Sequence, residues 1–316
     1  MKIQLVTPAP LNLNNGNRIT AQRWAAILKK LGHRVEILQE YRGEPCDLLI
    51  ALHARRSAES IRRFHHSQPN QPVIVVLTGT DLYRDIHAHR QAQQSLELAT
   101  RIVVLQKMAL QELPKRFHGK THVIYQSAEP LHRKRPDRAK FFRVCVIGHL
   151  RSEKDPLRAA LAVRRLPRNS RIQLTHVGLA LDDRLEKSAA DEVARNPRYR
   201  WVGQLSHRKT RELLARSHLV CITSRMEGSS NVLSEALASG VPVIASKIPG
   251  LIGTLGENFL GYFTVGDTQG LADLLFKAET DAKFYRALKS ECARLAPLVK
   301  SARELADWRR VLQEVA

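Results

Sequence analysis

Short apolar runs alternate with amphipathic stretches along the whole chain of 316 residues. In the first part, runs rich in β-branched residues have the length of strands, at residues 3–7, 34–39, 47–52, 73–77, 101–105 and 122–125. Between the first two runs, residues 20–31 have helical periodicity, which stops at Gly32. Such alternation predicts a parallel sheet that is covered by helices on both faces.

A second series of the same kind follows. Its strands are predicted at residues 142–147, 171–177, 200–201, 219–223 and 241–245, and its helices include residues 156–165, 209–216 and 231–239. The run 133–140 between the two series consists of charge and proline, which is typical of a solvated linker, although a nuclear-localisation or nucleic-acid patch has the same composition.

We therefore expect an α/β chain with two Rossmann-like parallel-sheet domains that face each other across a cleft, with ligands at the carboxyl ends of the strands. The first domain is expected to cover residues 1–135 and the second residues 142–300, joined by a linker at 136–141. The helix predicted within residues 301–316 is expected to pack back on the first domain.

The net charge of +21, from 51 Lys and Arg against 30 Asp and Glu, predicts an anionic partner. A basic protein that binds nucleic acid or a membrane surface is one alternative. Only 5% of the residues are aromatic, and no basic arm exists outside the linker run, so stacked bases are not indicated. No spanning segment or leader is evident, so a cytoplasmic protein without integral membrane association is expected. The four cysteines are far apart in the sequence, which indicates neither a zinc site nor a disulfide scaffold.

The most informative motif for function begins where the predicted strand 219–223 ends. Its loop contains Glu227 and leads through Ser229 and Ser230 into a helix that stops at Gly240. Free N–H groups at such a helix start can bind phosphate, and Glu235, one turn into the helix, can accept two adjacent hydroxyls. Two carboxylates at this spacing are, by themselves, more often capping or surface groups.

The complete string 224–246 resembles the Glu-x7-Glu signature of the retaining nucleotide-sugar glycosyltransferases of family 4, whose fold is GT-B. The resemblance covers nearly the whole chain. It implies that Glu227 faces the donor sugar and that Glu235 holds the ribose of UDP. It also implies that the segment 201–205 receives the uracil.

The loop 148–155 matches the place where the family binds the diphosphate with an arginine and a lysine. Lys154 occupies the lysine position, whereas His149 stands where the arginine is usual and Arg151 follows two residues later. We favour Arg151 because its charge does not depend on pH, although a solvated loop pairing with Glu153 and Asp155 is an alternative.

The resemblance thus implies a donor set of His149, Arg151, Lys154, Val202, Gly203, Leu205, Arg225, Glu227, Gly228, Ser229, Ser230, Asn231, Val232 and Glu235. No Asp-x-Asp motif occurs in the sequence. This absence agrees with the GT-B resemblance, which implies that side chains and a helix dipole stabilise the leaving UDP and that neither a metal nor another cofactor is expected.

Three segments at predicted strand ends of the first domain are candidates for acceptor binding. They contribute Asn15, Gly16, Asn17, Arg18, His53, Arg55, Thr80, Asp81 and Arg84. Many relatives have a histidine where this chain has Thr78, so His53 or Asp81 is the candidate at the reaction centre, with a structural histidine as the alternative. The arginines favour a phosphate-like oxyanion over a neutral sugar. The catalytic candidates are Glu227, Lys154, Arg151 and His53.

Four strings together resemble one subgroup, the selenosugar synthases of selenoneine biosynthesis. They are residues 75–86, 148–157, 224–228 and 261–268. This resemblance implies that selenophosphate is joined to the sugar of UDP-N-acetylglucosamine or UDP-glucose, which forms a C–Se bond and releases UDP and phosphate. The alternative is a family 4 transferase with a sugar, lipid-linked or thiol acceptor. The residues leave retention or inversion at the anomeric carbon open.

Overall fold

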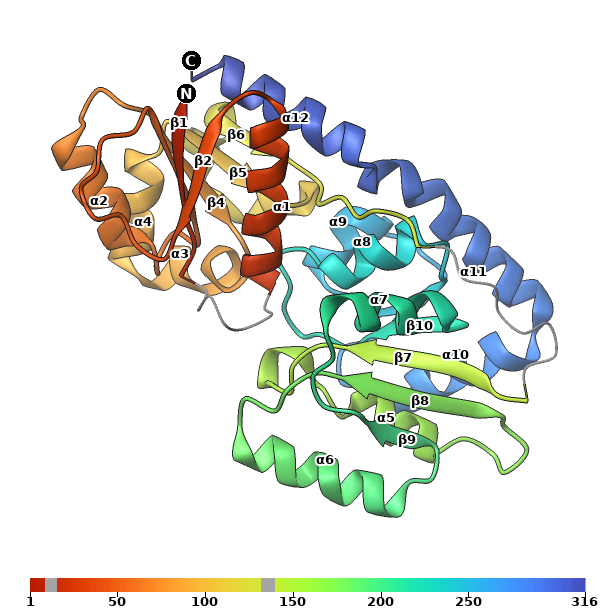
Figure 1. Ribbon diagram of the computed structural model, residues 1–316. Coiled ribbons are helices and arrows are strands. Elements are labelled where there is room, and N and C mark those ends of the chain that lie inside the picture. The colour runs from red at the N-terminus through yellow and green to blue at the C-terminus, as the bar shows by residue number, and fades with distance from the viewer. Residues whose placement is uncertain (9–15, 132–139, 316) are drawn as a thin grey trace. The chain divides into compact units, whose positions relative to one another are not determined.

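The computed structural model describes residues 1–8, 16–131 and 140–315 (Figure 1). Asn15 and most of the expected linker 136–141 lie outside the described residues. The chain divides into two compact units. The first comprises Met1–Gln126, Glu227–Ser230 and Ser301–Ala316, and the second comprises Ser127–Met226 and Asn231–Lys300.

The first unit contains a parallel sheet with the strand order β2-β1-β3-β4-β5-β6. The strands are β1 (Lys2–Val6), β2 (Arg34–Leu38), β3 (Leu48–Leu52), β4 (Val73–Leu77), β5 (Arg101–Val104) and β6 (Thr121–Val123). All six occur where the apolar runs predict them, and every pairing is parallel. The α/β class with parallel sheets is therefore confirmed for this half of the chain.

Helices cover both faces of this sheet, because the buried strand β3 sends alternate side chains to opposite faces. Leu49 and Ala51 pack in a core with α2 and α4, whereas Leu48 and Ile50 pack in a core with α1 and α12. The helical elements are α1 (Gly16–Lys30), α2 (Ala58–Ser67), α3 (Ile86–Ala88), α4 (Arg90–Leu98), α12 (Ser301–Gln313), the π-helical η1 (Asp81–Asp85) and the 3₁₀ elements η2 (Lys107–Glu112) and η3 (Lys115–Lys120). Helix α1 begins four residues before the predicted start, since its first turn is polar and carries no apolar periodicity.

The C-terminal helix α12 lies along α1 in the first unit (Figure 1). Trp24 and Trp308 meet edge to face, with ring centroids 4.8 Å apart. The Glu304 carboxylate, which is fully buried, accepts a hydrogen bond of 2.6 Å from Trp24 Nε1 and pairs with Arg23. A buried carboxylate that is paired in this way fixes the register between the two helices.

The second unit contains another parallel sheet, with the order β12-β11-β10-β7-β8-β9. The strands are β7 (Phe142–Ile147), β8 (Ile172–Val177), β9 (Tyr199–Trp201), β10 (Leu219–Ile222), β11 (Val243–Ser246) and β12 (Tyr262–Phe263). The prediction misses β12, which has only two residues. Strand β11 begins two residues later than predicted, because the N–H of Val241 bonds back to Ala236 O and Pro242 has no N–H to donate.

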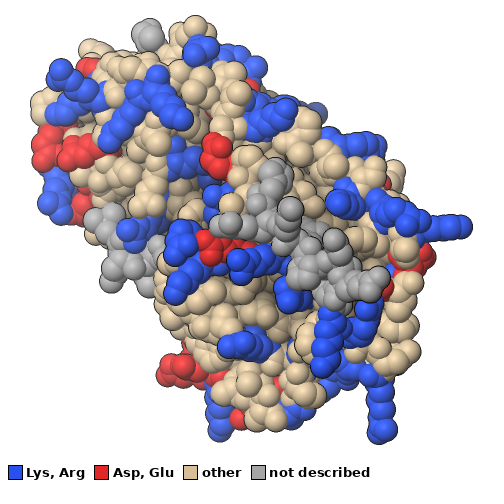
Figure 2. All heavy atoms as spheres, turned by 45° about the vertical axis from the view of Figure 1, so that its right-hand side comes forward, with Lys and Arg blue, Asp and Glu red and all other residues tan. Residues whose placement is uncertain are grey.

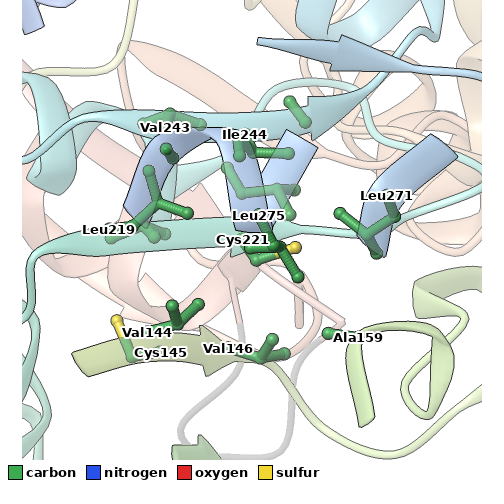
Figure 3. Close-up of a cluster of buried hydrophobic side chains, with 14 of the residues drawn as sticks. Val144, Cys145, Val146, Ala159, Leu219, Cys221, Val243, Ile244, Leu271 and Leu275 are labelled. Atoms are coloured by element: carbon green, nitrogen blue, oxygen red, sulfur yellow. The ribbon is translucent and has the colours of Figure 1, made fainter. Parts of the chain in front are cut away.

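Helices also cover both faces of this second sheet. They are α5 (Arg158–Arg164), α6 (Asp183–Arg195), α7 (His207–Arg216), α8 (Asn231–Ala238), α9 (Pro249–Leu255), α10 (Thr268–Thr280) and α11 (Ala282–Leu295), with the 3₁₀ turns η4 (Ser152–Lys154) and η5 (Ala296–Val299). Figure 3 shows Leu271 and Leu275 of α10 packed against Cys221 of β10, in a core that also contains Ala159 of α5. This hydrophobic core supports the strand ends from which the candidate donor loops emerge.

Lys and Arg side chains are spread over the visible surface and do not gather in one patch (Figure 2). In the described part of the chain, every helix is too short or too polar to traverse a bilayer. The charge surplus alone therefore does not locate a site, and the positions of individual charged groups have to be considered.

Candidate functional site

The candidate acceptor residues of the first unit follow three neighbouring strands. Strands β1, β3 and β4 are adjacent and parallel, so the segments that follow them meet at one edge of the sheet. Gly16, Asn17 and Arg18 form the first turn of α1, while His53 and Arg55 follow β3. Thr80 follows β4, and Asp81 and Arg84 lie in η1.

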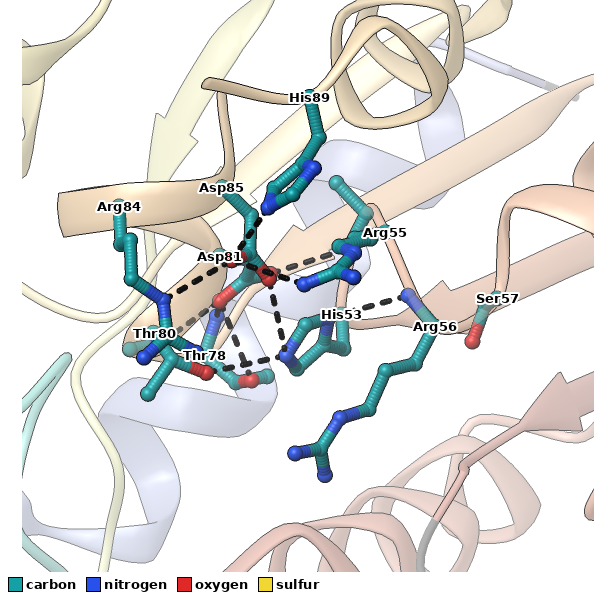
Figure 4. A network of polar contacts seen from close by, with 12 residues as sticks. His53, Arg55, Arg56, Ser57, Thr78, Thr80, Asp81, Arg84, Asp85 and His89 are labelled. Carbon is teal, nitrogen blue, oxygen red and sulfur yellow. Dashed lines mark hydrogen bonds and ion pairs between the residues drawn. The ribbon is translucent and has the colours of Figure 1, made fainter. Parts of the chain in front are cut away.

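Asp81 connects two of these segments (Figure 4). One carboxylate oxygen accepts hydrogen bonds from the N–H groups of Thr78 at 2.9 Å and Gly79 at 2.8 Å. The other oxygen accepts from the N–H of Ala54 at 3.0 Å. Asp81 is fully buried, so its carboxylate holds the loop after β3 against the loop after β4.

His53 has both ring nitrogens engaged. Nδ1 accepts a hydrogen bond from the N–H of Arg56 at 3.2 Å, which leaves the ring proton on Nε2. Nε2 lies 3.1 Å from Thr80 Oγ1 and 3.8 Å from the carboxylate of Asp85. Burial lowers the pKa of His53 below its ordinary value, which favours the neutral ring. The backbone at His53 is left-handed, with φ of 74°, and this turns the ring into the cluster.

Asp85, which the sequence analysis did not single out, is the centre of a group of basic side chains. Its buried carboxylate lies 3.2 Å from Arg84 Nε, 3.5 Å from Arg55 Nη1 and 3.9 Å from His89 Nε2. The side chains of Arg55 and Arg84 remain 42% and 51% exposed. Figure 4 shows them converging on Asp85 from different elements, while Arg56 extends away. A buried anion thus holds two half-exposed guanidinium groups in place.

Segment Glu227–Ser230 follows β10 in the sequence but belongs to the first unit. Glu227 is 8% exposed, and Ser230 is also buried. Gly228 passes so close to Thr78 that a methyl group added at its Cα would overlap the Thr78 carbonyl. Only glycine allows this approach of two backbones.

In the second unit, the loop after β10 is bound to the loop after β7. The N–H of Arg225 donates to Glu153 O at 2.8 Å, and Thr223 Oγ1 donates to Lys154 O at 2.9 Å. The exposed Arg225 side chain also lies 3.6 Å from the carboxylate of Asp155. Lys154 ends η4 and is half-buried, and Arg151 precedes η4 and is exposed. Lys154 and Arg151 therefore lie on a loop that is held in place by hydrogen bonds to the loop after β10.

The side chain of His149 is held in place by a hydrogen bond within the second unit. Its Nδ1 accepts a hydrogen bond of 3.1 Å from the N–H of Leu179. Beneath it, the buried His176 lies between Gly148 O at 3.0 Å and Tyr199 Oη at 3.1 Å, and burial lowers the pKa of His176 to about 4. A neutral His176 therefore donates from Nε2 to Gly148 O and accepts from Tyr199. This bridge fixes the end of β7, from which the loop departs.

The remaining candidate donor residues follow β9 and begin α8. Val202, Gly203 and Leu205 are half-buried, and Gly203 O accepts from the N–H of Gly178 at 2.8 Å. Asn231 and Val232 form the first turn of α8, directly after Ser229 and Ser230. Glu235 is 8% exposed, and its Oε1 lies 3.0 Å from Nε2 of His207, a residue that the sequence reasoning did not identify.

Three residues with a structural role in these sites, Asp85, His207 and His176, could not be identified from the sequence. Asp85 lies 30 positions from Arg55, and His207 lies 28 positions from Glu235. His176 reads only as part of a buried strand. No local pattern relates such residues, because the fold alone brings them together. Among the described residues, no group of three or more His, Cys, Asp and Glu side chains is arranged to hold a metal ion.

Known structures share this fold. The structure of Anabaena HepE in complex with UDP has a TM-score of 0.78 at 18% identity, over 99% of this chain and 100% of that one. Sucrose-phosphate synthase from Thermosynechococcus elongatus has a TM-score of 0.79 at 16% identity, over 99% and 98%. At these identities the likeness shows the fold, which is that of the GT-B glycosyltransferases.

The sequence also has a curated relative and matches a family. Over 76 residues it is 38% identical to N-acetyl-alpha-D-glucosaminyl L-malate synthase from Bacillus anthracis, a match that spans 24% of this chain and a fifth of that protein. Residues 127–294, more than half of the chain, match the model of the family described as glycosyl transferases group 1. The chain therefore belongs to the group 1 glycosyl transferases.

Proposed function

We propose that this chain is a selenosugar synthase, which transfers the sugar of a UDP-sugar to selenophosphate. On the donor side, the proposal assigns the diphosphate to Lys154 and Arg151 with the N-terminal turn of α8. Support comes from the hydrogen bonds between the loops after β7 and β10, because the first loop carries Lys154 and Arg151 and the chain runs from the second loop into α8. These groups would stabilise the charge that develops on the departing UDP.

The observation that carries the acceptor assignment is the cation group around Asp85. Arg55 and Arg84 both contact the buried carboxylate of Asp85, so two positive charges face one negative charge there. The three backbone N–H groups bound to Asp81 already satisfy that carboxylate. The half-exposed guanidinium groups of Arg55 and Arg84 therefore have donors left for an incoming oxyanion. A neutral acceptor would leave these donors without a function.

The proposed chemistry balances without an oxidant or a reductant. The selenium of selenophosphate attacks the anomeric carbon, a C–Se bond forms, and the C–O bond to UDP breaks as UDP takes the electron pair. Water then attacks phosphorus and the P–Se bond breaks, which yields the selenosugar and phosphate. The nucleophile is already ionised, so a general base is not required at the first step. The engaged nitrogens of His53 are compatible with a role in positioning Thr80.

The test is a matrix of donors and acceptors under anaerobic conditions. Purified protein is incubated with UDP-glucose or UDP-N-acetylglucosamine and with selenophosphate, phosphate, L-malate, thiols or sugars. UDP release and product mass are measured. Selenophosphate should give the fastest UDP release and a product that contains selenium. Glu227→Ala and Lys154→Ala should abolish turnover in folded protein, and near-normal UDP release by either variant would contradict the donor assignment.

A second candidate acceptor is a small carboxylate. The Bacillus anthracis relative is named for a product that contains L-malate, which is also anionic, and the same arginines could bind a carboxylate. Faster UDP release with L-malate than with selenophosphate would favour this candidate. Fastest release with a neutral sugar would contradict both anionic assignments.

A further inference from the structure

The histidine at the start of α7 contacts a carboxylate that is central to the proposed donor site. His207 is the first residue of α7 and follows Ser206, whose side chain caps the helix by accepting from the N–H of Lys209. The His207 side chain is 51% exposed, yet its Nε2 lies 3.0 Å from Oε1 of Glu235. Glu235 belongs to α8, and only 10% of its side chain is exposed.

The stability of the fold does not require this contact. An ion pair or hydrogen bond with a half-exposed partner contributes little, about 0–1 kcal/mol. Ser206 caps α7 without any help from His207, and α8 is anchored by buried Leu233, Ala236 and Leu237. What the contact does determine is the orientation of the Glu235 carboxylate, which would otherwise rotate about its terminal torsion.

The two oxygens of Glu235 differ in their surroundings. Oε1 accepts from His207, and no donor among the described residues lies within hydrogen-bond distance of Oε2. A carboxylate oxygen has two acceptor positions, so Oε1 can accept a second hydrogen bond beside that from His207. Both oxygens therefore remain able to accept from a pair of adjacent hydroxyl groups.

We infer that His207 is a positioning residue for ribose recognition, which holds the Glu235 carboxylate in the orientation that accepts the 2′- and 3′-hydroxyls of UDP. This inference rests on the proposed donor function of the second unit. It predicts that His207 affects the binding of the ribose hydroxyls and has no effect on binding of the uracil or the diphosphate.

The experiment compares two nucleotides, UDP and 2′,3′-dideoxy-UDP, by isothermal titration calorimetry. The native protein should bind UDP more tightly than 2′,3′-dideoxy-UDP. In His207→Ala, the affinity for UDP should fall about fivefold, the effect of one hydrogen bond to a charged group at a partly exposed site, while that for dideoxy-UDP stays unchanged. His207→Gln keeps an N–H donor and should recover most of the loss. Arg208→Ala is the matched control, because Arg208 follows His207 on the same helix and pairs only with Glu212 among the described residues.

The outcomes separate this inference from the proposed function. An equal fall for both nucleotides in His207→Ala, or none for either, would overturn the role of His207 while leaving UDP binding intact. Equal affinity of the native protein for both nucleotides would overturn the ribose role of Glu235 and this inference with it. Failure of the native protein to bind UDP at all would overturn the donor proposal. Thermal unfolding of each variant verifies that the fold is intact.

Discussion

The buried Asp81 carboxylate provides a direct test of how the first unit holds its strand-end loops together. In Asp81→Asn, the remaining carbonyl oxygen can accept from Thr78 and Gly79, but the new NH₂ group faces the N–H of Ala54, a donor 3.0 Å from the former oxygen. Two charge-assisted bonds become neutral, and one buried N–H loses its acceptor. With about 1 kcal/mol for each weakened bond and about 1–3 kcal/mol for the unpaired donor, the first unit should lose at least about 3 kcal/mol.

The measurement uses urea unfolding followed by tryptophan fluorescence. The chain has three tryptophans, of which Trp24 and Trp308 lie in the first unit and Trp201 in the second. A Trp201→Phe background therefore makes the fluorescence report on the first unit alone. In this background, Asp81→Asn should lower the midpoint, and Asp81→Ala should lower it further, because all three N–H groups then lack a partner.

The matched control is Asp47→Asn, which also lies in the first unit. Asp47 is exposed and accepts a hydrogen bond of 2.6 Å from the N–H of Lys2. Asparagine keeps a carbonyl oxygen that can accept this bond at a solvated site, so the change should stay below about 1 kcal/mol. A loss of less than about 1 kcal/mol in Asp81→Asn would refute the assignment of Asp81 as the brace between the two loops.

Three further predictions concern the glycine approach, the buried histidine and the cation group. Gly228→Ala should reduce kcat/KM for UDP release at least tenfold, because its methyl group would overlap the Thr78 carbonyl, and a normal rate would contradict the close approach. Burial lowers the pKa of His176 from 6.5 to about 4, so its contribution is present above pH 6.5 and is lost as the pH falls toward 4. The free energy of unfolding, measured by urea titration at a series of pH values, should fall by about 3 kcal/mol over this window. In His176→Gln, this part of the pH dependence should be absent. Arg84→Ala should raise KM for the anionic acceptor about tenfold and leave KM for the UDP-sugar unchanged, while Arg62→Ala, at an exposed pair with Glu59 on α2, should change neither.

The strands of both sheets could be predicted because their signal is local. Runs such as 73–77 are apolar at every position, as a strand buried on both faces requires, and they lie where predicted. The signal fails where a strand depends on its neighbour. Tyr262 and Phe263 form β12 only because β11 offers them a parallel partner, and a two-residue strand leaves no periodicity to detect.

The candidate site could be predicted only as far as chain segments. Parallel topology places the ends of neighbouring strands together, and that was enough to select the segments around His53 and Thr80 in advance. The role of a side chain within a segment depends on its long-range partners. Asp81 and Asp85 lie four positions apart in one segment, yet Asp81 binds backbone N–H groups and Asp85 binds arginine side chains.

In both units, the exposed cations lie on loops that are held in place by a buried polar group. In each, a buried polar group fixes strand-end backbone before any ligand arrives: Asp81 in the first unit, and His176 in the second. The cations on those loops then need little reorganisation to meet an anion, which is the main source of electrostatic binding and catalysis. The net charge of +21 contributes long-range attraction that salt screens within about 10 Å. Under the proposed function, specificity comes from these few placed groups, and salt should weaken association with anions more than it changes the preference among them.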